Sequence, residues 1–268
     1  MTLSAAVAGY DHVLLDLDGC VWVGEAPTPG APEAVAALRQ AGKRLLFLTN
    51  DPRHTAEELV RKLWRLGFQA SMDEIASVGA AVQHHLATRR SGGSAFVIGA
   101  QALVDHVAAA GLRIVNNTDL APRADVVVVA AHEAFDYREL RIAVQAVLRG
   151  AELLGATRDA TFPMPDGPWP GTGPILAAVE TATGARAATL GKPEAAFYAA
   201  ALERLGPGRA LGVGDSLATD VRGAAAAGID AALVLTGSTT REEALAAGDP
   251  RPQHVAASLG ALVLAPAE

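Results

Sequence analysis

The sequence is poor in cysteine, in aromatic residues and in basic charge, and it lacks a long apolar run. Its single cysteine, Cys20, excludes an intramolecular disulfide and makes a cysteine-based metal site implausible. The net charge of −7 argues against a nucleic-acid partner, because a phosphate backbone demands clustered Lys and Arg. The longest apolar stretch, around residues 126–131, is far too short to span a bilayer, and residues 1–10 lack the pattern of a signal peptide. We therefore expect a soluble cytoplasmic protein without a membrane partner.

The length and the apolar pattern indicate an α/β protein. At 268 residues, half of them apolar, the chain can form one elaborated domain or two small ones. Short apolar runs predict buried strands at residues 12–17, 44–48, 210–213 and 231–235. Start and stop signals predict helices at residues 32–40, 55–67, 194–205 and 219–227. This alternation is typical of a doubly wound, mostly parallel sheet with helices on both faces.

The middle of the chain repeats the alternation and predicts a second βα unit. Its expected strands are residues 96–98, 113–115, 126–130 and 153–156, and its expected helices are residues 102–110 and 137–149. The segment 161–174 contains five prolines and is expected to be a loop.

The residues that could carry chemistry fall at the ends of the predicted strands or just before a helix. They are, in chain order, Asp16, Asp18, Thr49, Asn50, Lys192 and Asp215. Ligands of an open parallel sheet bind outside the carboxyl ends of its strands, so we expect these side chains to converge. Clustered carboxylates repel one another unless a cation lies among them, and oxygen ligands without cysteine or clustered histidine favour Mg²⁺.

Such a cluster is suited to phosphoryl transfer. Asp16 can attack phosphorus to form an aspartyl-phosphate, which water then hydrolyses. Asp18, where the chain turns into the Gly19 loop, can protonate the leaving alcohol and later deprotonate the water. Thr49, Lys192 and backbone N–H groups after Asp16 can bind the phosphoryl oxygens.

Four segments in this order resemble the motifs of the haloacid-dehalogenase-like hydrolase superfamily, and most closely its subfamily IIA, the NagD-like phosphatases. The segments are residues 16–19 (DLDG), 48–50 (LTN), 191–193 (GKP) and 212–220 (GVGDSLATD). The resemblance implies a Rossmann-like core from residues 1–79 and 186–268, with an inserted α/β cap domain of the C2 type at residues 80–185.

The resemblance also implies a role for each motif residue. Asp16 is the nucleophile, Asp18 the general acid and base, and Thr49 and Lys192 bind phosphate, with backbone contacts from Gly19 and Asn50. Mg²⁺ is bound by the Asp16 carboxylate, the Asp18 backbone carbonyl and the Asp215 carboxylate. Asp220 is a supporting acid that holds Lys192 or a metal-bound water.

Three segments depart from the usual pattern of this branch. They are Asp51-Pro52-Arg53 after the second motif, Thr157-Arg158-Asp159 in the cap, and Thr172 within residues 170–173. We expect none of them to touch the chemistry. Arg158 is nevertheless a candidate for binding a second anionic group of the substrate, with a surface pairing to Asp159 as the alternative. His132, at the end of a cap strand, could meet substrate, although a structural role is the simpler expectation.

The expected activity is Mg²⁺-dependent hydrolysis of a small phosphorylated metabolite. Sugar phosphates, glycerol phosphate, phosphoglycolate and nucleoside monophosphates all remain open, as does a homodimer. A receiver domain shares the acidic site but is about half this length. A dehalogenase of the same superfamily, or a non-catalytic phosphate-binding protein on this fold, are the remaining alternatives.

Overall fold

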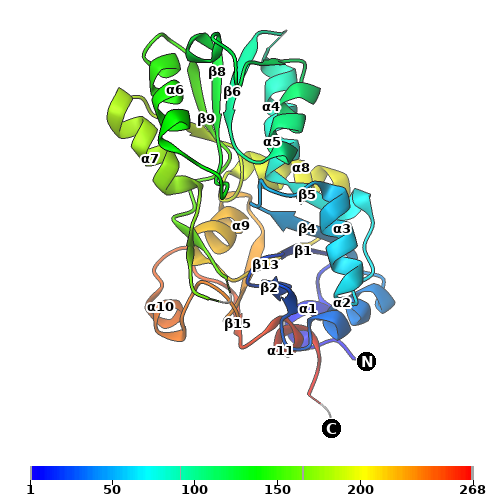
Figure 1. Ribbon diagram of the computed structural model, residues 1–268. Helices are drawn as coiled ribbons and strands as arrows, with labels where there is room; N and C mark the ends of the chain where they lie inside the picture. Colours follow the sequence, from blue (N-terminus) through cyan, green and yellow to red (C-terminus); the bar gives the residue numbers. More distant parts are fainter. Residues whose placement is uncertain (1, 91, 165, 267–268) are drawn as a thin grey trace.

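Two parallel β-sheets, each covered by its own helices, lie one above the other in the molecule (Figure 1). The computed structural model describes residues 2–90, 92–164 and 166–266. The larger sheet has the strand order β15-β14-β13-β1-β4-β5. These strands are β1 (His12–Asp16), β4 (Arg44–Thr49), β5 (Ile75–Ser77), β13 (Ala210–Gly214), β14 (Asp230–Val234) and β15 (His254–Ala256). The expected doubly wound core is thereby confirmed.

The central strand β1 is buried on both faces, which explains its unbroken apolar sequence. Val13 and Leu15 point to one face, where they pack with side chains of α2 (Ala31–Gln40), α3 (Ala56–Arg65) and α11 (Leu259–Val263). Leu14 points to the other face, which is covered by α8 (Ala195–Leu205) and α9 (Arg222–Ala226). The short helices α1 (Ala5–Ala8) and α10 (Arg241–Ala246) complete this unit.

The strand order reverses at β1, and this reversal creates the site. The chain runs from β1 to β4 on one side of it, whereas the later strand β13 pairs with its other side. In open α/β sheets ligands bind at this switch point, outside the carboxyl ends of the strands. Asp16 is the last residue of β1 and therefore lies at the switch point.

The smaller sheet has the strand order β12-β9-β8-β6-β7 and forms the inserted unit. Its strands are β6 (Ser94–Ile98), β7 (Arg113–Ile114), β8 (Val126–Val129), β9 (Glu152–Gly155) and β12 (Ala188–Thr189). One face is covered by α4 (Val78–Arg89) and α5 (Gln101–Ala109), and the other by α6 (Tyr137–Val147) and α7 (Thr172–Thr183). The pairing of β12 with β9 extends this unit beyond residue 185, where the boundary was expected.

The expected loop at residues 161–174 is partly wrong. It contains a hairpin of β10 (Thr161–Phe162) and β11 (Trp169–Pro170), and α7 begins inside it at Thr172. Residue 165 lies outside the described part of the chain. A second hairpin, β2 (Trp22–Val23) with β3 (Ala26–Pro27), follows β1. The helix expected at residues 219–227 is a π-helical turn, Leu217–Val221, that continues into α9.

Within the described residues, every helix is too short or too polar to cross a bilayer.

The capping box expected at the start of α3 is present and gives a test of local stability. Thr55 Oγ1 accepts a hydrogen bond from the Glu58 backbone N–H at 3.2 Å, and the Glu58 carboxylate accepts from the Thr55 N–H at 2.8 Å. We expect Thr55→Ala to lower the free energy of unfolding by about 0.5–2 kcal/mol, because the Glu58 backbone N–H loses its acceptor. Urea denaturation measures this loss, and Thr55→Ser should recover most of it.

Candidate active site

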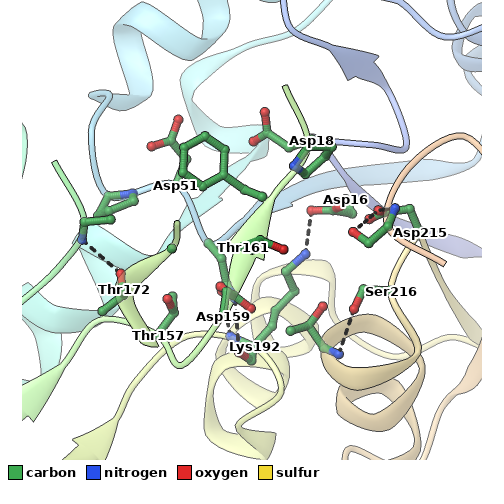
Figure 2. Close-up of a pocket in the computed structure, with 18 of the residues that line it drawn as sticks. Asp16, Asp18, Asp51, Thr157, Asp159, Thr161, Thr172, Lys192, Asp215 and Ser216 are labelled. Carbon is green, nitrogen blue, oxygen red and sulfur yellow. Dashed lines mark hydrogen bonds and ion pairs between the residues drawn. The ribbon is translucent and has the colours of Figure 1, made fainter. Parts of the chain in front are cut away.

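The side chains at the switch point line one cavity of about 100 Å³ between the two units (Figure 2). Asp16, Asp18, Asn50, Lys192 and Asp215 all line it, as predicted from their positions at strand ends. The cap contributes residues from the loop after β9 and from the β10–β11 hairpin. The cavity is therefore lined by residues of both the core and the cap.

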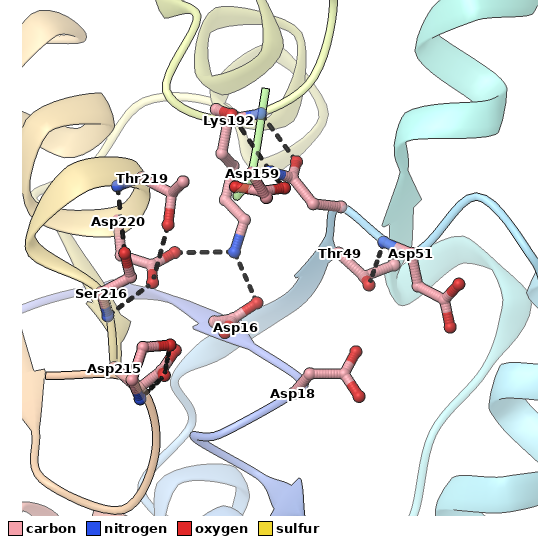
Figure 3. Close-up of polar contacts among 12 residues, drawn as sticks. Asp16, Asp18, Thr49, Asp51, Asp159, Lys192, Asp215, Ser216, Thr219 and Asp220 are labelled. Carbon is pink, nitrogen blue, oxygen red and sulfur yellow. Dashed lines mark hydrogen bonds and ion pairs between the residues drawn. The ribbon is translucent and has the colours of Figure 1, made fainter. Parts of the chain in front are cut away.

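Lys192 is the central cation of the site, and its side chain is only 3% exposed. Its Nζ donates to Asp16 Oδ1 at 2.5 Å and to Asp220 Oδ1 at 2.7 Å (Figure 3). Burial alone lowers the pKa of a lysine, but the two carboxylates outweigh burial and raise the pKa of Lys192 well above its ordinary value. Both contacts therefore favour the charged form of the ammonium group.

Asp16, Asp215 and Asp220 form a compact acidic cluster. One oxygen of each lies within 4.8 Å of the others. Burial, and then the neighbouring carboxylates, raise the pKa of Asp16 and of Asp215. The cluster thus carries more negative charge than Lys192 compensates, and its hard oxygen donors suit Mg²⁺.

The surrounding hydrogen bonds separate the two carboxylates that would bind metal from the one that supports them. Asp220 is fully engaged, since Oδ1 accepts from Lys192 and Oδ2 accepts from the Ser216 backbone N–H at 3.1 Å. Asp215 Oδ2 accepts from the Ser238 hydroxyl at 2.6 Å and from its backbone N–H. This arrangement supports Asp16 and Asp215 as metal ligands, with Asp220 holding Lys192.

Gly19 is required by the approach of Asp215 to the turn after β1. Its backbone has φ = +88°, and a Cβ atom there would lie 2.5 Å from the Asp215 carboxylate. A side chain at this position would therefore displace Asp215. Gly19 of the first motif therefore leaves space for the carboxylate of Asp215 in the fourth motif.

Asp18 lies apart from the Lys192 cluster, on the side of the site where Asp51 is found (Figure 3). Its Oδ1 accepts a hydrogen bond at 2.9 Å from Nε1 of the buried Trp22, which therefore does more than pack. Burial first, and then the Asp51 charge, raise the pKa of Asp18. A carboxyl group with a raised pKa is suited to donate a proton.

Thr49 and Asn50 connect the second motif to its neighbours. Thr49 Oγ1 accepts from the Asp51 backbone N–H at 2.9 Å. The Asn50 amide accepts from the Lys192 N–H at 2.8 Å and donates to the Asp159 carboxylate of the cap at 2.8 Å. A Cβ on Gly191 would lie 2.5 Å from Asn50 Oδ1, so this contact needs a glycine. Backbone contact with phosphate was expected of Asn50, whereas its side chain fixes the Lys192 loop and meets the cap.

The pairing of Arg158 with Asp159, one of the two expectations for this residue, is wrong. Its guanidinium makes a bidentate ion pair with Glu180 of α7, at 2.9 and 2.8 Å, rather than pairing with Asp159. Arg158 does not line the cavity, whereas its neighbours Thr157 and Asp159 do. His132 bonds to Glu139 at 3.0 Å and likewise lies outside this cavity. Both side chains are thus paired with a carboxylate of the cap.

The three departures from the family pattern, in contrast, all reach the cavity. Asp51, Arg53, Asp159 and Thr172 line it. Asp51 Oδ1 accepts a hydrogen bond from Arg53 at 2.8 Å, and Asp51 Oδ2 is hydrogen-bonded to His54 at 2.7 Å. These two partners hold the pKa of Asp51 well below its usual range, although burial alone would raise it. Position next to the second motif, at a strand end, was the available signal for Asp51 and Arg53. For Asp159 and Ser238 the chain offered only proximity to predicted strand ends, and Thr172 lies in the segment that was expected to be a loop.

The protein has a doubly wound sheet with an acidic cluster and a buried lysine at its switch point, under an inserted α/β cap. These features define a class of capped enzymes built around a strand-end aspartate. Sequence comparison matches residues 13–113 to the family described as haloacid dehalogenase-like hydrolase, and residues 189–262 to the HAD-hydrolase-like family. The chain belongs to the haloacid dehalogenase-like hydrolases. The resemblance seen in the four motifs is thereby confirmed.

Individual relatives cover nearly the whole chain. The D-glycerol 3-phosphate phosphatase of Mycobacterium tuberculosis is 37% identical, over 94% of this chain and 71% of its own length. Human chronophin is 39% identical, over 88% of this chain and 86% of its own. The crystal structure of the M. tuberculosis glycerol phosphate phosphatase in complex with magnesium superposes with a TM-score of 0.88 at 35% identity, covering 98% of this chain and 79% of that one.

The metal assignment predicts an unusual stability change. We expect Asp215→Asn to raise the free energy of unfolding in the presence of a chelator, because burial and Asp220 both disfavour the Asp215 charge. Mg²⁺ should stabilise the wild type by about 2.7 kcal/mol at 100 times its Kd and the variant much less. Chemical denaturation with and without Mg²⁺ measures both effects, with the exposed Asp119→Asn as control. Equal stabilisation of wild type and variant would contradict the assignment.

The Arg158–Glu180 pair predicts an acid-sensitive contribution to stability. Arg158 lowers the pKa of Glu180 from 4.5 to about 2, so this contribution is complete above pH 4.5 and is lost as the pH falls through about 2. We expect Glu180→Gln to destabilise the protein by about 1–2 kcal/mol at pH 7, since Arg158 is 39% exposed, and to flatten this part of the pH profile of stability.

The same pair predicts that Arg158 does not select the substrate. Arg158→Ala should leave the ratio of kcat/KM between anionic and neutral substrates unchanged. A change in that ratio would show that Arg158 contributes to substrate specificity.

Proposed function

We propose that the protein is a Mg²⁺-dependent phosphatase that hydrolyses small phosphomonoesters through an aspartyl-phosphate on Asp16. The observation that carries this proposal is the separation of two acids. Asp16 accepts a hydrogen bond from the Lys192 ammonium group, whereas Asp18 lies away from that cation and accepts its hydrogen bond from the Trp22 indole. Similarity to a glycerol phosphate phosphatase that binds magnesium supports it.

The first half-reaction uses Asp16 as nucleophile. A carboxylate oxygen of Asp16 forms a bond to phosphorus while the bond from phosphorus to the ester oxygen breaks, and Asp18 delivers its proton to the departing alkoxide. Lys192 and the Thr49 hydroxyl neutralise or bind the phosphoryl oxygens. Mg²⁺ held by Asp16, Asp215 and the Asp18 backbone carbonyl would supply positive charge against the phosphate and so permit attack by an anionic carboxylate.

The second half-reaction reverses the proton transfer. Asp18, now a carboxylate, removes a proton from water as the water oxygen attacks phosphorus, and the bond from phosphorus to the Asp16 oxygen breaks. Inorganic phosphate leaves and Asp16 is regenerated. Lys192 keeps Asp16 in position through both steps because Asp220 holds its ammonium group from the other side.

The size of the site supports small substrates. The cavity at Asp16 measures about 100 Å³ and has cap residues on one wall. A phosphoryl group fills much of such a space, and the cap wall leaves little room for a folded protein chain. A cap closed over bound substrate would also exclude water and so strengthen the electrostatic interactions in the site.

Substitution of each acid tests the division of roles. We expect Asp16→Asn to abolish Mg²⁺-dependent phosphate release from p-nitrophenyl phosphate, because no nucleophile remains. Asp18→Asn should reduce kcat for both glycerol phosphate and p-nitrophenyl phosphate by about 10²–10⁴-fold, because Asp18 also activates the water of the second half-reaction. The initial burst of p-nitrophenol should be slowed less, because this leaving group needs little protonation. Phosphate release with each substrate is the measurement, and Asp119→Asn is the matched control. A fully active Asp16→Asn variant, or no turnover of any phosphomonoester by the folded wild type with Mg²⁺, would contradict the proposal.

A further inference from the structure

A second cavity, of about 480 Å³, lies beside the catalytic one. The two share part of their walls, since Arg53, Ala131 and Phe162 line both. The Arg53 guanidinium lies 4.4 Å from the centre of the Phe162 ring, so a residue of the core and a residue of the cap hairpin meet at the boundary. The shared walls place the second cavity, which we call the outer cavity, next to the cavity that contains Asp16.

The outer cavity concentrates aromatic side chains in a chain that has few. Aromatic residues make up 4% of the sequence, yet Phe135, Phe162 and Trp169 are three of the nine residues that line this cavity. Phe162 and Trp169 stand edge to face, with ring centres 6.2 Å apart and planes at 62°. Pro170 and Ile175 add further apolar surface. The walls thus favour a flat apolar group over a hydroxylated chain.

The charged groups of the outer cavity argue against a second anion as its occupant. Arg53 is already paired with Asp51, and His132 with Glu139. Glu133 also lines the cavity and would repel a carboxylate or a second phosphate. The cavity therefore offers an anion little uncompensated positive charge.

We propose that the outer cavity binds the leaving group of the substrate and selects phosphomonoesters whose leaving group carries a flat aromatic or heteroaromatic ring. This inference rests on the proposed phosphatase function and specifies its substrate class. A cavity of this volume lies within the range of small-ligand sites. A ring bound there packs against Phe162 and Trp169, while the phosphate reaches Asp16 and Lys192.

A pair of substrates of equal shape tests the selection for a ring. Benzyl phosphate and cyclohexylmethyl phosphate have leaving alcohols of similar acidity and differ in whether the six-membered ring is flat and aromatic. We expect wild-type kcat/KM to favour benzyl phosphate by about 2- to 10-fold, mainly through KM, which is the size of an aromatic pair interaction. Trp169→Leu should abolish this preference and Trp169→Phe should keep most of it.

The control is Tyr137→Leu, which removes an aromatic ring that is 80% exposed on α6 and lines neither cavity. It should leave the preference intact. A wild type without preference, or a Trp169→Leu variant that loses activity equally toward both substrates, would overturn the assignment of the outer cavity while leaving phosphatase activity in place. Absence of turnover with both substrates and with p-nitrophenyl phosphate would instead overturn the proposed function on which it rests.

Discussion

Lys192 places a buried positive charge between the carboxylates of Asp16 and Asp220, and these two ion pairs join parts of the chain that are far apart in sequence. Removing one partner of a buried ion pair leaves an uncompensated charge, which typically costs about 3–5 kcal/mol. The positions of β1, of the loop before α8 and of the turn after β13 therefore depend on one another. The same contact orients the Asp16 carboxylate, so stability and catalysis share one interaction.

The cap is connected to this arrangement through the second motif. Asn50 binds the backbone of Lys192 on one side and the Asp159 carboxylate of the cap on the other. Arg53, three residues further along, lies against Phe162 of the cap hairpin. The loop after β4 thus contacts both Lys192 and the walls of the outer cavity. It connects the core, where Asp16 is the proposed nucleophile, to the cap residues that we propose to bind the leaving group.

The core of the site was predictable from sequence because its signals are local. A buried strand that ends in an acid and a glycine predicts both β1 and the position of Asp16, and parallel strands bring such ends to one edge. The cap residues were not predictable in this way. Arg158 was expected in the site, but its guanidinium is paired with Glu180, 22 residues later in the chain. Glu180 lies on α7, a helix whose start falls in the proline-rich segment that was expected to be a loop. Arg53 and Asp51 were set aside as departures from a pattern, and only the three-dimensional packing shows that they border the cavity.

The proposed function depends on covalent phosphorylation of Asp16 during turnover. The most direct test is to mix the wild-type protein with p-nitrophenyl phosphate and Mg²⁺, quench in acid on the millisecond scale, reduce with borohydride and analyse peptides by mass spectrometry. An aspartyl-phosphate is converted by this treatment to homoserine. We therefore expect homoserine at position 16 and an unmodified aspartate at position 18. Steady turnover with no modified residue, or modification at a residue other than Asp16, would contradict it.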